Sequence, residues 1–371
     1  MLPLALVLRD ARSTDFRPCS ARNLSKDSYM TAVPTAPEPQ DTWQFHSAPP
    51  AQWAQWIKDC DGGFFQAPPA LDSSAPAGEP LYCIHRSSDG VDGIALAVRH
   101  ACSLSRDPRH VYFPGPPRVR RPERASSMLR ELFLALQTAG AAEIVMDSFD
   151  AGWIPKIPMA TQEVRREEFV LSLGGSPEER LARCSANHRR RIRHGDRAGW
   201  TLRPLAGDAA KTAMAAVQAA ARSRAADHGR QFRGNPVVWD GSRFADDIAP
   251  LGATVYSGWD GDRLLGAMLV GWAGLRAFYL VGGCTPAGYE ASAAHWIHWQ
   301  IATMLAERGL TAYNLGGVRV HPIADEEHGL RQFKTGFGPT IVACYGATWR
   351  VRPIHARTHA ATRLITGWLG Q

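Results

Sequence analysis

The stretch ATVYSGWDGDRLLGAMLV, residues 253–270, decides how this chain folds. Two apolar runs flank the turn Asp260-Gly261-Asp262, and an Asp/Gly turn between such runs is typical of a β-hairpin. The same pattern stands earlier, in LYCIHRSSDGVDGIALAV, residues 81–98, around the turn Ser88-Asp89-Gly90. The chain therefore contains the hairpin twice, although the letters of the two copies differ.

The sequence after each hairpin also repeats. Each hairpin leads through a further apolar run, residues 111–113 or 277–281, to a helical pattern, residues 127–139 or 292–308. Each helical pattern stops at a glycine, Gly140 or Gly309, and a further strand pattern follows, residues 143–147 or 311–315. Two copies of a strand–strand–strand–helix–strand unit predict a mixed α/β (α+β) fold with two tandem lobes, each a mixed sheet flanked by helices.

Length and composition agree with two lobes. The 371 residues exceed the roughly 250–300 at which a single core stops growing. With 45% hydrophobic and 21% charged residues, the chain is typical of globular proteins and not of fibrous or disordered ones. We expect a disordered leader over residues 1–41, with Met30 as an alternative start, an N-terminal lobe over 42–175 and a C-terminal lobe over 176–371.

Cysteine usage and hydropathy bear on where the protein works. The seven cysteines are scattered and form no CxxC pair, so we expect reduced, mostly buried thiols. The apolar start lacks the basic residues of a signal peptide, and no later run reaches the ~18 apolar residues of a membrane span. These features predict a cytoplasmic protein. Its net charge of +7 favours anionic partners, such as nucleic acid, nucleotides or membrane headgroups.

A basic helix is predicted between the lobes. The start Ser176-Pro177-Glu178-Glu179 has the form of a capping box, and the helix is expected to run on toward Gly195 or Gly199. Within it, Arg189, Arg193 and Arg197 form one i, i+4 row, with Arg190 beside it. Such a row favours a bound phosphate. The alternative is a solvated face with salt bridges to Glu163, Glu167 or Glu168. A second helix is expected over residues 208–228.

The residues that carry chemistry are expected near the end of the chain. Residues 313–319, YNLGGVR, end a strand in a double glycine, which permits close approach of a ligand. Residues 329–338, GLRQFKTGFG, then place Lys334 between Phe333 and Phe337. A lysine there can stabilise an oxyanion or hold a phosphate. The alternative is that both phenylalanines are core residues and that Lys334 faces solvent.

These motifs resemble a known family. The pattern Tyr-(Asp/Asn)-Leu-Gly-Gly, then Gly-Leu, then Phe-Lys-x-Gly-Phe-Gly is similar to the C-terminal signature of the Fem family, the peptidoglycan-bridge aminoacyltransferases and their relatives. With the Arg-rich helix before Gly199-Trp200 and the tandem lobes, the resemblance covers residues 43–350. It implies a tandem GNAT-like fold, here without a coiled-coil arm, and transfer of an aminoacyl group from aminoacyl-tRNA to an acceptor amine without a covalent enzyme intermediate.

The resemblance also implies roles for individual residues. Lys334 matches the family lysine near the transferring acyl group, and we expect Asp325 and Tyr313 as the other catalytic residues. Asn314 stands where the family often has Asp, which weakens that position as a base. The expected substrate- and tRNA-binding residues are Arg189, Arg190, Arg193, Asn314, Gly316, Gly317, Arg319, Phe333 and Phe337.

The partners follow from the same resemblance. The donor would be aminoacyl-tRNA, and the acceptor a peptidoglycan precursor or a small amine of secondary metabolism. We expect a monomer with peripheral membrane contact, and the reaction requires neither a metal nor an organic cofactor.

Two other functions are compatible with the sequence. The first is an acyl-CoA-dependent N-acyltransferase of GNAT type. The joints at residues 114–121 and 282–290 lack the pattern Arg-x-x-Gly-x-Gly that cradles pyrophosphate, and their prolines remove amide donors, so CoA is the less favoured donor. The second is a non-catalytic nucleic-acid-binding protein that uses the arginine helix.

Overall fold

The duplicated unit is present in the computed structural model, which describes residues 42–68, 78–100, 109–147, 149–150, 160–227, 251–320 and 325–350. The leader predicted over residues 1–41 lies outside these ranges. The first unit comprises β1 (Thr42–His46), β2 (Glu79–Ser87), β3 (Gly90–His100), β4 (His110–Phe113), α3 (Ala125–Thr138) and β6 (Glu143–Met146). The second comprises β8 (Thr201–Leu205), β9 (Leu251–Asp260), β10 (Arg263–Ala273), β11 (Arg276–Cys284), α8 (Ala293–Glu307) and β12 (Ala312–Arg319).

The pairing of the strands confirms the repeat. In each unit the hairpin strands are antiparallel, and the strands before and after the long helix are parallel neighbours, β4 with β6 and β11 with β12. The short elements α1 (Trp53–Asp59), η2 (Phe64–Gln66), β5 (Arg118–Val119) and η3 (Pro122–Arg124) are additions to the first unit.

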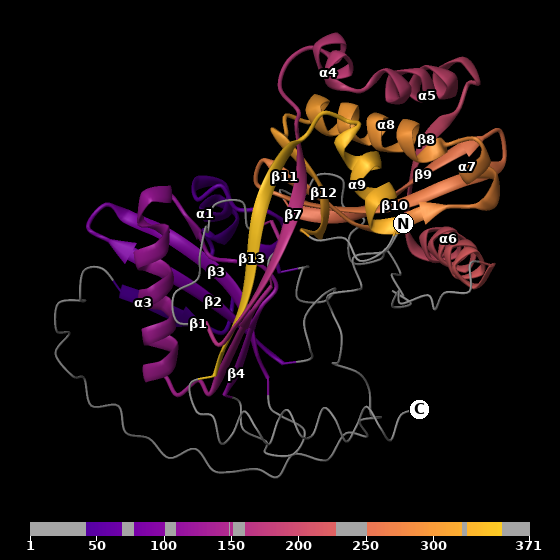
Figure 1. Ribbon diagram of the computed structural model, residues 1–371. Helices are drawn as coiled ribbons and strands as arrows, with labels where there is room; N and C mark the ends of the chain where they lie inside the picture. Colours follow the sequence, from indigo (N-terminus) through magenta and orange to yellow (C-terminus); the bar gives the residue numbers. More distant parts are fainter. Residues whose placement is uncertain are drawn as a thin grey trace.

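Two long strands join the units into one sheet. They are β7 (Gln162–Ser172), which follows the first unit in the chain, and β13 (Thr340–Arg350), which follows the second. Each pairs with the other unit: β7 lies antiparallel to β12, and β13 lies antiparallel to β6. They also pair with each other, so the sheet order passes through β6-β13-β7-β12. Figure 1 shows β7 and β13 side by side through the middle of the molecule.

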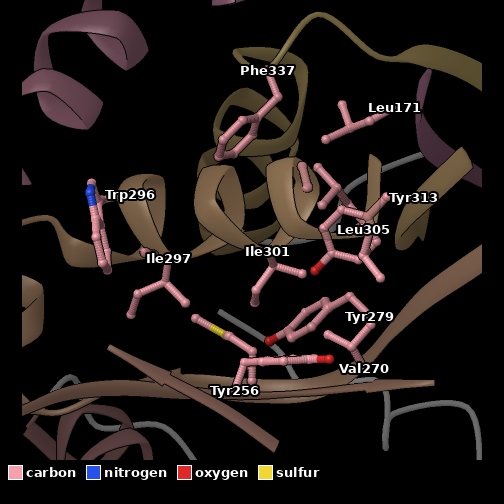
Figure 2. Packing of buried hydrophobic residues seen from close by; sticks show 14 of the residues in the cluster. Leu171, Tyr256, Val270, Tyr279, Trp296, Ile297, Ile301, Leu305, Tyr313 and Phe337 are labelled. Carbon is pink, nitrogen blue, oxygen red and sulfur yellow. The ribbon is translucent and has the colours of Figure 1, made fainter. Parts of the chain in front are cut away.

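Helices cover both faces of the second half of the sheet. On one face, α8 packs its apolar side against Tyr256, Val270 and Tyr279 (Figure 2). On the other, α6 (Gly207–Asp227) packs Met214 and Val217 against alternate residues of the same strands. The bounds of α6 agree with the helix expected over 208–228. No helix in the described part of the chain is long and apolar enough to cross a membrane.

The helix expected from residue 176 onward is two helices, so that prediction was wrong in its middle. The capping box is present, since the Ser176 hydroxyl accepts from the Glu179 amide and the Glu179 carboxylate accepts from the Ser176 amide. However, α4 (Pro177–Arg183) ends at Cys184, whose backbone is extended. Ser185 then caps α5 (Ala186–Arg197) by accepting from the His188 amide, and α5 carries the arginine row.

Candidate active site

The candidate site lies where β12 parts from its neighbours. β11 and β12 pair only from Arg276 and Ala312 to Phe278 and Asn314, although both strands continue. On its other side, β12 shifts register against β7 between Asn314 and Gly317. Gly316 has a φ of +72°, which favours glycine, and its amide donates to the Asn314 side-chain oxygen at 2.8 Å. Strand pairing is therefore interrupted at the double glycine, and we call this break in the pairing the opening in β12.

Gly317 brings two cations to this opening. A Cβ on Gly317 would lie 2.5 Å from Arg166 Nη2, so only glycine leaves room for the Arg166 guanidinium. The carbonyl oxygen of Gly317 accepts from Lys334 Nζ at 3.3 Å. The predicted lysine motif and the predicted double glycine thus meet at one residue.

Lys334 is buried, so the alternative in which it faces solvent is wrong. It lies near the end of α9 (Asp325–Thr335) and is 4% exposed. Burial lowers its pKa to about 7, and the charge of Arg166 adds to this effect while Glu168 opposes it. A lysine with this pKa can carry a charge for an oxyanion and can also release its proton near neutral pH.

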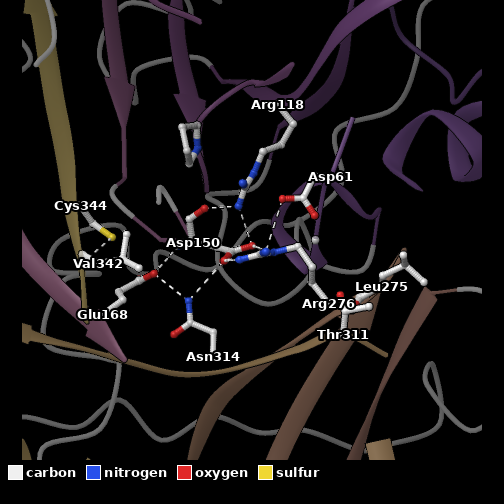
Figure 3. A network of polar contacts seen from close by, with 12 residues as sticks. Asp61, Arg118, Asp150, Glu168, Leu275, Arg276, Thr311, Asn314, Val342 and Cys344 are labelled. Atoms are coloured by element: carbon white, nitrogen blue, oxygen red, sulfur yellow. Dashed lines mark hydrogen bonds and ion pairs between the residues drawn. The ribbon is translucent and has the colours of Figure 1, made fainter. Parts of the chain in front are cut away.

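Glu168 faces the opening from β7. It is 1% exposed, and its Oε2 accepts from Asn314 Nδ2 at 2.8 Å and from the Asp150 amide at 2.9 Å (Figure 3). Burial raises its pKa, although Arg166 opposes this. The sequence suggested Glu168 as a partner of the arginine helix. In the structure it instead lies beside Arg166 and Asn314.

Asp150 holds the two units together next to the site. Its carboxylate pairs with Arg118 of the first unit at 2.7 Å and with Arg276 of the second at 2.8 Å (Figure 3). Although burial opposes ionisation, the charges of Arg276 and Arg118 lower its pKa to about 2. Its backbone is left-handed, with a φ of +53°. This network fixes the first unit relative to the opening in β12.

A third carboxyl group with a shifted pKa stands at the end of β6. Tyr112 donates to Asp147 Oδ2 at 2.5 Å, and the Asp147 amide donates to the Phe113 carbonyl. Burial raises the pKa of Asp147 to about 6, against the hydrogen bond from Tyr112 and the charge of Arg166. Asp147 can therefore exchange a proton near neutral pH.

The other predicted residues lie in different places. Tyr313 points away from Asn314 into the core, where its hydroxyl bonds to His298 Nδ1 at 2.9 Å (Figure 2). Phe337 belongs to the same core, and Phe333 packs against it. The side chains of Asp325 and Arg319 lie outside the described part of the structure, although both residues belong to described elements, α9 and β12.

The glycines of the lysine motif have a packing role. A Cβ on Gly336 would lie 1.9 Å from the His188 ring of α5. The Gly336 carbonyl accepts from the Ser185 amide at 2.8 Å, and the Phe333 carbonyl lies 2.8 Å from His188 Nε2. These contacts attach the basic helix directly to the helix that carries Lys334.

The basic helix presents only some of its arginines to solvent. Arg189 is half-buried and donates to the carbonyl oxygens of Ala182 and Cys184 at the end of α4. Arg190 and Arg193 are exposed. Of the acids suggested as their partners, Glu167 pairs with Arg331 and Glu168 with Arg166. Of the predicted binding residues on this helix, Arg190 and Arg193 can therefore contact an external anion, as can the exposed Arg197 of the same row.

Sequence reasoning missed most of the acidic and basic residues around the opening. Arg166, Asp147, Asp150, Arg118 and Arg276 come from separate segments and form no local motif. The sequence signal for such residues is a charged residue within an apolar strand pattern, as in EEFVLSL of residues 167–173. This signal indicates a buried charge but does not identify the residues that contact it. Within the described ranges, no group of three or more His, Cys, Asp and Glu side chains is arranged to hold a metal ion.

Comparison with known proteins gives the site a family context. Residues 258–363 match the model of the FemAB family. The crystal structure of FemX is similar over 82% of this chain and 93% of that chain, with 13% identity and a TM-score of 0.56. L-PGS from Bacillus licheniformis is similar over 86% and 97%, with 12% identity and a TM-score of 0.45. No curated protein sequence matches the chain.

At 13% identity, the likeness to FemX concerns the fold alone. The two-lobed architecture is the tandem GNAT-like fold that the sequence predicts, and the described elements include no coiled-coil arm. The FemAB match spans both the double glycine and the lysine motif, which meet at Gly317. Over residues 258–363, which include both motifs, the chain is therefore similar to the FemAB family, and its fold is similar to that of FemX.

Proposed function

We propose that this protein transfers an amino acid from aminoacyl-tRNA to the amine of a peptidoglycan precursor or a small metabolite. The match of residues 258–363 to the FemAB family supports aminoacyl transfer in general. The observation that carries the proposal is the buried Lys334, which contacts the Gly317 carbonyl at the opening in β12. The reduced, buried state of the five described cysteines supports a cytoplasmic location.

The proposed reaction is a direct attack. The acceptor amine adds to the ester carbonyl, and the protonated Lys334 stabilises the oxyanion that forms. The carbon–oxygen ester bond then breaks, an amide forms, and the ribose oxygen leaves as a hydroxyl group that carries the proton lost by the amine. Asp147, whose pKa is raised to about 6, can take this proton from the amine and return it to the ribose oxygen. The protein mainly aligns two reactants, which alone can contribute several orders of magnitude in rate.

The choice of donor rests on two surfaces. Arg190 and Arg193 are exposed on α5, which is attached to the lysine helix. By contrast, the joint after β11, where an acyl-CoA enzyme would hold pyrophosphate, is occupied by α7 (Pro286–Glu290). There the Gly288 amide already bonds to Thr285, and a Cβ on Gly288 would lie 1.8 Å from the Leu265 carbonyl oxygen. Both observations favour a tRNA donor over CoA.

The test is transfer of label from two donors. The protein is incubated with total tRNA charged with radiolabelled amino acids, or with radiolabelled acetyl-CoA, in the presence of a small-molecule and precursor extract. We expect amide-linked label from the tRNA only. Label from CoA alone would overturn the proposal.

The tRNA contact has its own variant. Arg190→Gln with Arg193→Gln should weaken tRNA binding and reduce the dependence of affinity on salt by about one unit of slope per lost phosphate contact. Arg130→Gln, an exposed arginine of α3, is the matched control. An unchanged salt slope in the double variant would remove α5 from the donor site.

A further inference from the structure

The two oxygens of the Glu168 carboxylate have different surroundings. Oε2 is saturated, because it accepts from both Asn314 Nδ2 and the Asp150 amide (Figure 3). Oε1 is buried and has no hydrogen-bond partner. The two donors at Oε2 fix the orientation of the carboxylate, so the open acceptor is held in one direction.

Arg166 supplies a matching open donor. It lies two residues before Glu168 on β7, so both side chains project from the same face of the strand. Arg166 is 6% exposed, and its Nη1 has no hydrogen-bond partner. Its Nη2 is 3.6 Å from Glu168 Oε1, which is too far for a hydrogen bond. Two buried, oppositely charged groups thus each keep one unused polar atom.

This pair borders the residue that Lys334 touches. The Arg166 guanidinium lies against Gly317, and Lys334 Nζ donates to the carbonyl of the same Gly317. Buried polar atoms in native proteins almost always have partners, and an exception calls for an explanation such as a catalytic role or a bound molecule. The unused atoms beside the proposed catalytic lysine therefore point to a ligand.

The ligand must offer a donor to Glu168 and an acceptor to Arg166. An α-aminoacyl group has both, since its cationic ammonium and its carbonyl oxygen are attached to adjacent carbons. An acetyl group has no donor. We propose that Glu168 and Arg166 form the subsite for the amino end of the transferred amino acid, with Glu168 Oε1 accepting from its α-ammonium and Arg166 Nη1 donating to its carbonyl oxygen. This inference rests on the proposed function, because it takes the transferred group to be aminoacyl.

The variant Glu168→Gln tests this subsite at one atom. The Asn314 and Asp150 donors require an acceptor, so the glutamine oxygen takes the place of Oε2. Its NH₂ group then occupies the place of Oε1 and turns the open acceptor into a donor. Glu167→Gln is the matched control, because Glu167 is the next residue on the same strand, projects from the opposite face and pairs with Arg331.

Binding is measured by calorimetry with 3′-aminoacylamino-adenosines, stable mimics of the aminoacyl-tRNA end. One mimic is made for each of the twenty amino acids, and each is compared with its N-acetyl derivative. We expect at least one mimic to bind wild-type protein at least about tenfold more tightly than its N-acetyl form, as for a hydrogen bond to a buried charge. Glu168→Gln should abolish this preference, and Glu167→Gln should keep it.

Three results would overturn the subsite: no mimic binds, both forms bind equally, or Glu168→Gln retains the preference. The transfer assay separates this failure from that of the proposed function. If tRNA-dependent transfer is intact but the preference is absent, only the subsite is refuted, and Glu168 is left as a base for the acceptor amine or a structural residue. If the preference is present but tRNA donates no label, the subsite stands and the tRNA donor is refuted.

Discussion

The two repeated units end their parallel strand pairs in different ways. In the first unit, β4 and β6 pair over their whole length, and the Asp147 amide continues the pairing by donating to Phe113. In the second unit, β11 and β12 pair over three residues and then part, and β12 turns through Gly316 with a left-handed backbone. The same supersecondary unit is thus closed in one copy and open in the other. At the end of the open copy, Lys334 of α9 contacts Gly317, and at the end of the closed copy the Asp147 carboxyl group lies near enough to Arg166 to be affected by its charge.

The largest effect is expected from removing the cation at the open end. Lys334→Met keeps most of the buried volume but cannot stabilise an oxyanion, so single-turnover transfer should fall by about 10²–10³-fold. Arg130→Gln, on the exposed face of α3, is the folding and handling control. Transfer at the wild-type rate by Lys334→Met would show that the open end is not the catalytic one.

The next effect concerns the joint between the two copies. Asp150→Asn leaves Arg118 and Arg276 buried without their shared anion, which should cost about 3–5 kcal/mol of unfolding free energy in urea. Because the pKa of Asp150 is lowered to about 2, its stabilisation is complete above the unfolded pKa near 4 and is lost as pH falls toward 2. The variant should therefore lose part of the acid-induced fall in stability. A cost below about 1 kcal/mol would contradict this role.

A smaller effect should follow from closing the open end sterically. Gly317→Ala places a Cβ 2.5 Å from Arg166 Nη2 and 2.6 Å from the Glu167 carbonyl oxygen, so we expect a loss of about 1–3 kcal/mol of unfolding free energy. Gly329→Ala in α9 meets no atom within 4 Å and should be neutral or stabilising by about 0.5–1 kcal/mol. Equal stability of the two variants in thermal unfolding would argue against the tight contact at Gly317.

The smallest effect is on the pH dependence of transfer, to which Lys334 at the open end and Asp147 at the closed end contribute on opposite sides. Lys334 acts as a cation with a pKa lowered to about 7, so transfer should fall about tenfold per pH unit above that value. Asp147 acts as a base with a pKa raised to about 6, so transfer should also fall below pH 6. Arginine keeps its charge, so Lys334→Arg should be slower but should lose only the alkaline fall. An alkaline fall that persists in Lys334→Arg would assign it to another group.

The lowered pKa of Lys334 also makes the free energy of unfolding depend on pH. Its folded pKa of about 7 lies below the usual 10.5, so the unfolded chain binds more protons between these values. Stability from this group should therefore rise with pH across that window, and Lys334→Met should remove the rise.

The sequence predicted the elements that depend on local patterns of residues. It did not predict contacts between segments that are far apart along the chain. Both hairpins, both long helices and the strands around them follow from local apolar patterns and turn residues, and the structure confirms them. The motifs predicted the double glycine and Lys334 as site residues, but the contact of Lys334 with Gly317 comes from the structure. The partners of Glu168 did not, because Asn314 and Asp150 lie far from it along the chain and only the sheet order brings them together. The break at Cys184 was missed because Ser185 caps a second helix within the same apolar pattern.

Each of β7 and β13 pairs with the unit that it does not follow in the chain, and this affects folding during synthesis. The first unit acquires its neighbour at β6 only when Ala347 can pair with Met146, and β13 is among the last described segments to leave the ribosome. Contacts at such separation slow folding, and β6 has an unpaired edge until they form. A nascent chain carrying only the first unit therefore exposes a strand edge that a second chain can occupy, so ribosome-bound intermediates are the stage at which this protein is most prone to intermolecular pairing.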